Sequence, residues 1–148
     1  MTESGLPRPA TAFAEHFTDP LYDDVGNDFA PFGSDEGSDL LAEWGDRRDQ
    51  LDRDSTLATV LRCEPREVAE IAGPMQDVDG LETAMTVTSA AFVLLRLVGH
   101  LGEEDRRLAL EAVDFQIRTV TDMNPGIDRE LDVLKTQRED LESWRNPT

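Results

Sequence analysis

Residues 81–101 read LETAMTVTSAAFVLLRLVGHL, and this stretch decides the fold. Its apolar residues fall on most faces of a helix rather than on one stripe, which is typical of a helix buried on nearly all sides. Asp79, with Glu82 three residues later, resembles a capping box at the start of the helix, and Gly102 is expected to close it. We therefore predict a central, buried helix over these residues.

Arg96 and His100 are the two polar side chains in the second half of this stretch, residues 90–101. If Arg96 is buried it requires a carboxylate partner, for which Asp35, Asp39 and Asp114 are the candidates, so that a structural ion pair would join a loop to the core. The alternative is that Arg96 lies at an exposed helix edge, with its aliphatic stem along the apolar surface. His100 is placed in the last turn of the helix, where the helix dipole favours a cation, and a structural role is expected for it.

Further helical patterns lie on both sides of the central helix. They cover about residues 35–51, 54–63, 64–73, 103–123 and 127–144. Ser34 and Asp35 provide capping groups for the first, and Asp54 and Ser55 for the second. The short connection at Gly102 makes the helix that follows antiparallel to the central one. The last pattern has an apolar stripe at heptad-like spacing, with Arg138 at the intervening position: Ile127, Leu131, Leu134, Leu141 and Trp144.

Together these patterns predict an all-α, single-domain helical bundle of about three long and two or three short helices. We expect a flexible tail over residues 1–10 and one helical domain over 11–146. Residues 11–34 are loop-rich and form an irregular acidic N-terminal region, in which a short strand pair is expected around Tyr22. Residues 35–146 are expected to be helical.

The acidic residues are concentrated near the N-terminus. The net charge is −18, and the stretch from Glu15 to Asp54 holds thirteen Asp and Glu residues against three Arg. Such charge repels nucleic-acid phosphates and anionic membranes, so we predict neither direct nucleic-acid binding nor membrane binding, and it attracts basic proteins. A single cysteine, and no apolar run that would form a signal peptide or a membrane span, lead us to expect a cytoplasmic protein.

No set of catalytic residues stands out. The acidic loop lacks the ligand register of an EF-hand, and two histidines, His16 and His100, offer little acid–base chemistry. Cys63 lies in an apolar helical pattern and is expected to be an inert, buried thiol. We predict no cofactor and favour a non-enzymatic protein. Asp35 and Asp39 are the candidate ligands in the alternative of a small metal-dependent hydrolase.

Residues 29–39 read FAPFGSDEGSD, which resembles the FSPFGND-x-G-x-D signature of the YfeS-like bacterial proteins. The stretch is also similar, more loosely, to a family of uncharacterised bacterial domains with an F-x-N-D segment. Neither resemblance implies an established activity, although both imply a small bacterial protein. We interpret the motif as a joint between a loop and a helix. Its expected structural residues, together with Arg96, are Phe29, Phe32, Gly33, Ser34, Asp35 and Asp39.

The leading functional hypothesis is an acidic interaction protein, an accessory factor or an immunity-type inhibitor, that binds a basic protein partner. The predicted partner-binding residues are Asp19, Asp23, Asp24, Asp28, Glu43, Asp46 and Asp49. A helical homodimer is a further alternative, because the stripe of the last helix could pack against its own copy.

Overall fold

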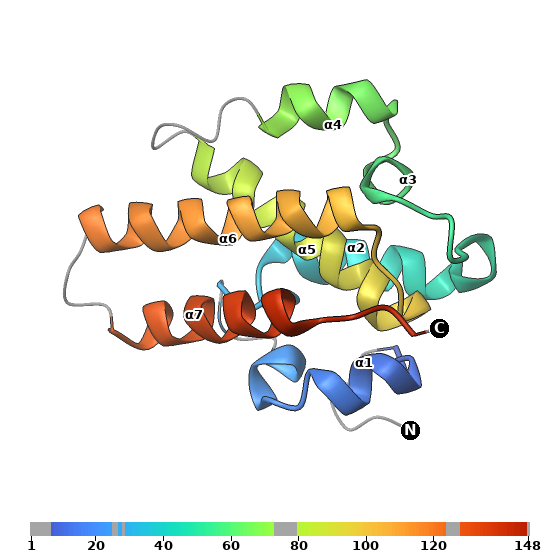
Figure 1. Ribbon diagram of the computed structural model, residues 1–148, viewed down its shortest axis with the longest axis horizontal. Helices are drawn as coiled ribbons and strands as arrows, with labels where there is room; N and C mark the ends of the chain where they lie inside the picture. Colours follow the sequence, from blue (N-terminus) through green and yellow to red (C-terminus); the bar gives the residue numbers. More distant parts are fainter. Residues whose placement is uncertain (1–6, 25–26, 28, 73–79, 124–127, 148) are drawn as a thin grey trace.

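The computed structural model describes residues 7–24, 27, 29–72, 80–123 and 128–147, and these form an all-α domain without strands (Figure 1). Seven α-helices and two short 3-10 helices follow one another along the described chain. They are α1 (Thr11–His16), η1 (Pro20–Asp23), α2 (Asp35–Asp46), η2 (Arg48–Gln50), α3 (Leu57–Leu61), α4 (Pro65–Ala72), α5 (Leu81–Val98), α6 (Glu103–Met123) and α7 (Asp128–Ser143). The prediction of a single-domain helical bundle is confirmed.

Helix α5 is the centre of the molecule, as its composition predicts. Twelve of its eighteen residues are buried, and it packs against α6, α2 and α3. Helices α6 and α7 run antiparallel to one another, and α6 also runs antiparallel to α5 (Figure 1). Among the described helices, α5 alone is long and apolar enough to span a membrane, but 67% of it is buried inside the bundle.

The end of α5 differs from the prediction. Gly99, not Gly102, closes the helix, because Gly99 adopts the left-handed backbone conformation (φ 76°) and its N–H donates to the carbonyl oxygens of Leu94 and Leu95. Glycine reaches this conformation without steric cost. Gly102 instead precedes α6, and His100 lies beyond the last turn of α5. The helix begins after Gly80, and the predicted cap Asp79 lies outside the described residues.

An arginine is buried at the centre of the apolar bundle. The side chain of Arg96 is 1% exposed, and its polar partners lie on residues 7–24, which we call the N-terminal strap. The Nε donates to the Pro7 carbonyl at 2.9 Å, and Nη1 donates to the Tyr22 carbonyl at 3.2 Å and to the Asp23 carboxylate at 3.1 Å. Burial lowers the pKa of Arg96, and the Asp23 carboxylate opposes that shift. The strap therefore neutralises the charge that α5 carries into the core.

The partner of Arg96 is none of the three carboxylates that the sequence suggested. Asp35 and Asp39 are exposed on α2, and Asp114 accepts a 2.6 Å hydrogen bond from Arg138. Asp23 takes the position because the strap crosses the last turns of α5, where the Ala10 N–H donates to the Arg96 carbonyl at 2.6 Å. Periodicity within α5 carries no information about which distant segment crosses it.

Aromatic side chains attach the strap to the bundle. Phe13, Phe17 and Tyr22 are buried, and the Phe17 ring contacts both Phe92 of α5 and Trp144, with ring centroids 5.4 Å apart in each case. Burial of each large apolar side chain contributes about 1.5–3 kcal/mol to folding. The strap is therefore part of the hydrophobic core.

The strand pair expected around Tyr22 is wrong, because this residue lies in the 3-10 helix η1. The Asp19 carboxylate accepts from the Leu21 N–H at 2.9 Å, and Pro20 occupies the first position of the turn. A capping carboxylate followed by proline favours a helical turn.

The loop before α2 is compressed against α5. The Ser34 hydroxyl caps α2 by accepting from the Gly37 N–H at 3.0 Å, as the sequence predicts. Ser89 of α5 donates to the Pro31 carbonyl at 2.8 Å. A Cβ on Gly37 would lie 2.2 Å from that carbonyl oxygen and 2.7 Å from the Ser89 hydroxyl. Only glycine fits at this crossing.

Aromatic residues of the same loop contribute unequally to the core. Phe32 is fully buried, whereas Phe29 is half-buried. The Phe29 carbonyl accepts a 2.6 Å hydrogen bond from Gln137 of α7. A Cβ on Gly33 would lie 1.8 Å from the Asn27 carbonyl oxygen. The segment is thus a structural joint between loop and helix.

Helices α2 and α3 are shorter than predicted. Helix α2 ends at Asp46 and η2 follows it. The N-cap of α3 is Thr56, not Asp54 or Ser55. The Leu57 N–H at the start of α3 donates to the Asp105 carboxylate of α6 at 3.2 Å. Asp105, which is distant in sequence, therefore helps to cap α3, whereas the local sequence assigned this capping to Asp54 and Ser55.

The buried stripe of α7 includes Gln137, not Arg138. Gln137 is fully buried beside Leu134 and Leu141, whereas the side chain of Arg138 is 41% exposed and pairs with Asp114 and Glu142. The helical repeat of 3.6 residues places either position near the stripe, and the long charged side chain takes the solvent side.

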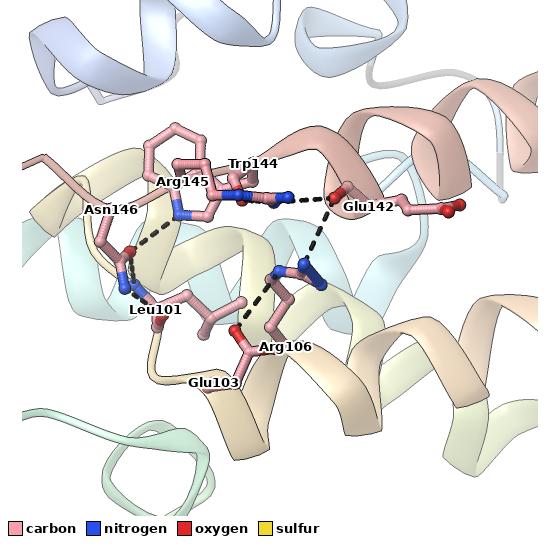
Figure 2. Close-up of polar contacts among 7 residues, drawn as sticks. All are labelled: Leu101, Glu103, Arg106, Glu142, Trp144, Arg145 and Asn146. Carbon is pink, nitrogen blue, oxygen red and sulfur yellow. Dashed lines mark hydrogen bonds and ion pairs between the residues drawn. The ribbon is translucent and has the colours of Figure 1, made fainter.

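The C-terminal residues join the end of α7 to the start of α6 (Figure 2). The side-chain amide of Asn146 accepts from the Leu101 N–H through Oδ1 at 2.9 Å and donates to the Leu101 carbonyl through Nδ2 at 2.8 Å. The Trp144 indole N–H donates to the same Oδ1 at 2.8 Å. Arg106 lies beside this contact and donates to the Glu142 carbonyl at 3.3 Å. This closure fixes Trp144 against the strap.

We expect Arg96→Ala to lower the free energy of unfolding by about 2–4 kcal/mol, because it leaves a cavity and unpaired carbonyl groups at Pro7 and Tyr22. Asp23→Asn should cost about 1 kcal/mol or less, since the Asp23 side chain is 62% exposed and water screens its charge. Urea unfolding measures both. Equal losses in the two variants would contradict this account of Arg96.

We expect Gly37→Ala to destabilise the protein by about 1–3 kcal/mol, because its Cβ overlaps the Pro31 carbonyl. This reverses the usual result inside a helix, where alanine is favoured over glycine. Gly102→Ala is the matched control, since its Cβ meets nothing within 4 Å. A gain in thermal stability for Gly37→Ala would show that the crossing is looser than the structure indicates.

Candidate functional site

The outer face of α2 is the strongest candidate site. At 3.6 residues per turn, its five acids project within about 100° of one another, on the side opposite the buried Leu41 and Trp44. We call these five residues the acidic face: Asp35, Glu36, Asp39, Glu43 and Asp46. No Lys or Arg lies between the ends of α2. The face is a continuous band of negative charge on a rigid element.

The five acids are exposed. Within the described chain, Glu43 alone among them forms an ion pair, with Arg62. The carboxylate of Glu36 accepts a hydrogen bond from the Thr86 hydroxyl of α5. Four of the five carboxylates therefore make no ion pair within the described chain, and three of these four, Asp35, Asp39 and Asp46, are directed into solvent. Such an arrangement attracts cations and basic proteins.

Arg62, which contacts the acidic face, has an unusual backbone conformation. Arg62 ends α3 in the left-handed conformation (φ 57°), a position where glycine is the usual residue. Its guanidinium lies 5.3 Å from the centre of the Trp44 ring and contacts the Glu43 carboxylate. An exposed ion pair and a cation–π contact contribute about 0.5–1 kcal/mol each, and the left-handed backbone costs about 1–2 kcal/mol. These terms nearly offset one another.

A hollow lies beside the start of the acidic face, between α2 and α5. Its volume is about 340 Å³, and Ser34, Asp35, Glu36, Glu82 and Met85 line it. Three of these five residues are carboxylates and none is basic. The hollow extends the negative potential of α2 toward α5.

Two of the four predicted partner-binding acids of the N-terminal region take part in the protein's own fold. Asp19 caps η1 and Asp23 neutralises Arg96. Asp24 is half-buried, and Asp28 lies outside the described residues. Of the other three predicted residues, Glu43 and Asp46 belong to the acidic face, and Asp49 lies exposed in η2 just after it.

The sequence missed the composition of the acidic face. It assigned Asp35 and Asp39 to capping, to Arg96 or to a metal, and it assigned no role to Arg62. The spacing of Asp35, Asp39, Glu43 and Asp46 at intervals of three and four residues was the available signal. Nothing in the local sequence indicated that Arg62 would lie over Trp44.

The other chemically versatile side chains of the described chain lie outside the acidic face. Among the described residues, no group of three or more His, Cys, Asp or Glu could hold a metal ion. Burial and the neighbouring Glu67 and Glu64 raise the pKa of Cys63, which is half-buried, so its thiol stays protonated. The Nδ1 of His100 is buried and has no hydrogen-bond partner in the described chain.

Tyr22 has a strongly perturbed environment beside Asp140. Its hydroxyl donates to the Asp140 carboxylate at 2.6 Å. Burial raises the pKa of Tyr22 well above its usual range, and the hydrogen bond to Asp140 raises it further. The Nε2 of His16 lies 2.8 Å from the Asp140 carbonyl oxygen, so this nitrogen carries the proton. Asp140 thus fixes two side chains of the strap.

Comparisons with protein-family models, with curated proteins and with solved structures found no match for this chain. The similarity of residues 29–39 to the YfeS-like signature stays a prediction.

Tyr22 is the protein's single tyrosine, so tyrosinate absorbance near 295 nm reports on it alone. Because folding raises the pKa of Tyr22, its contribution to stability is complete below the unfolded value of about 10 and is lost as the pH rises above it. We expect no tyrosinate signal until the protein unfolds in alkali, and an ordinary titration in urea. A tyrosinate signal from folded protein near pH 10 would contradict the buried contact.

Proposed function

We propose that this chain is a non-enzymatic interaction protein, an accessory factor or inhibitor, that binds a basic protein partner through the acidic face of α2. One observation carries the proposal: five exposed carboxylates lie on one side of a rigid helix that holds no basic residue. Other acids of the protein, such as Asp23, Asp114 and Asp140, are engaged in its own fold.

Electrostatic attraction would bring the partner to the face, and contacts with side chains around it would hold the complex. Charge complementarity of this kind accelerates association and is weakened by salt. Asp49 in η2 and Glu82 beside the hollow extend the same surface at its two ends. The Trp44 ring is buried beneath Arg62 at the edge of this surface, and it would add an aromatic contact where Arg62 moves away.

Neither alternative has comparable support. The candidate metal ligands Asp35 and Asp39 are exposed one turn apart, with no third ligand beside them in the described chain. Most of the stripe offered for a homodimer is occupied, because Leu134, Leu141 and Trp144 are buried in the chain's own core. Leu131 of the same stripe is half-buried, and Ile127 lies outside the described residues. The acidic face, in contrast, is exposed along the whole of α2.

The test replaces Asp35, Asp39 and Asp46 together with asparagine. Binding of fluorescein-labelled octa-arginine, followed by anisotropy at low salt, should weaken by about tenfold or more because the positive probe loses its counter-charges. A matched variant neutralises Glu111, Asp132 and Glu139, which are exposed acids of α6 and α7, and has the same net charge. The affinity of this control for octa-arginine should fall much less. Equal losses of octa-arginine affinity in the two triple variants would contradict a specific binding role, and would indicate that the acidic face only keeps the protein soluble.

A further inference from the structure

We propose that Arg62 occupies the docking position of an arginine side chain of the partner, and that it regulates the acidic face by competing for this position. The inference rests on the proposed function and gives it a specific contact. The contact consists of the Trp44 ring and the Glu43 carboxylate, with the protein's own guanidinium bound between them.

The backbone of Arg62 is the first line of support. Arg62 is the one non-glycine residue of the described chain with a positive φ, at a helix end that glycine would suit better. Contacts of the arginine side chain must therefore offset the unfavourable backbone conformation. The gain visible in the structure is its contact with Glu43 and Trp44.

The composition of the contact determines what it accepts. A planar guanidinium stacks on an aromatic face and donates hydrogen bonds to a carboxylate with its edge, whereas the rounder ammonium of lysine does this less well. Trp44 is held firmly, because its side chain is 5% exposed and its indole N–H donates to the Val60 carbonyl at 3.0 Å. The ring is thus a fixed platform for an arginine side chain.

The exposure of the pair permits exchange. The side chain of Arg62 is 50% exposed and that of Glu43 is 42% exposed, so Arg62 can move into water without leaving a buried charge. An arginine of the partner could then take the same place while the partner's other cations meet the rest of the acidic face. Arg62 would lower the affinity of the face for weakly basic proteins that cannot displace it.

The first experiment tests the contact alone. L-argininamide is titrated into ¹⁵N-labelled wild-type protein, Arg62→Ala and Arg118→Ala, and the indole N–H signals are followed by NMR. Arg118 is an exposed residue of α6, so its variant matches the change in net charge. We expect the Trp44 signal of Arg62→Ala to titrate at an about threefold to tenfold lower concentration than in the other two proteins. The Trp144 signal, from an indole bonded to Asn146, is the internal control.

Equal titration of Trp44 in all three proteins would overturn the inference. If Arg62→Ala fails to fold, Arg62→Gly replaces it, since glycine suits the backbone at this position and removes the same side chain. Adding Glu43→Gln to either variant should abolish the gain, because the carboxylate is half of the contact.

A second experiment separates this inference from the proposed function. Octa-arginine should bind Arg62→Ala more tightly than Arg118→Ala, and octa-lysine should show a smaller difference. Equal octa-arginine affinities would refute the role of Arg62 and leave the acidic face intact as a binding surface. Failure of every variant to bind octa-arginine at low salt would refute the proposed function, and the argininamide titration would still decide the contact at Trp44.

Discussion

The burial of Arg96 is the constraint on which the rest of this structure depends. A buried guanidinium in the last turn of an apolar helix is unfavourable unless its charge and its N–H groups are satisfied. The strap satisfies them with two carbonyl oxygens and the Asp23 carboxylate. In doing so it positions the aromatic rings that pack against α5 and the end of α7. One polar side chain thereby determines where the N-terminal segment lies.

The strap and the loop before α2 pass close to helices of the bundle, and glycine occurs at three of these close contacts. Gly37 admits the loop before α2, and Gly45 admits Pro7 of the strap, whose Cγ would lie 2.5 Å from an added Cβ. Gly99 combines the left-handed end of α5 with a close approach to Ala10. In a bundle of this size the interior is densely packed, so such crossings tolerate little added volume.

Some acids of this protein are bonded within its own fold and others are exposed to solvent, and the net charge does not distinguish between them. Asp19, Asp23, Asp105 and Asp140 cap helices or bind side chains of the fold. The five acids of α2 face solvent, with a single arginine of the described chain against them. Burial raises the pKa of Asp105, while its bond from the Leu57 N–H opposes that shift. The distinction between structural and available carboxylates depends on tertiary neighbours.

The sequence by itself determined the helical class, the central helix and the Ser34 cap, because these depend on periodicity and on groups within a few residues. Only the tertiary structure decided that Asp23 would neutralise Arg96, that Gln137 would enter the core in place of Arg138, and that Arg62 would cover Trp44. Each of these contacts joins segments far apart in the chain. Their geometry depends on how helices cross, and a repeat of 3.6 residues specifies which face is buried but not which segment covers it.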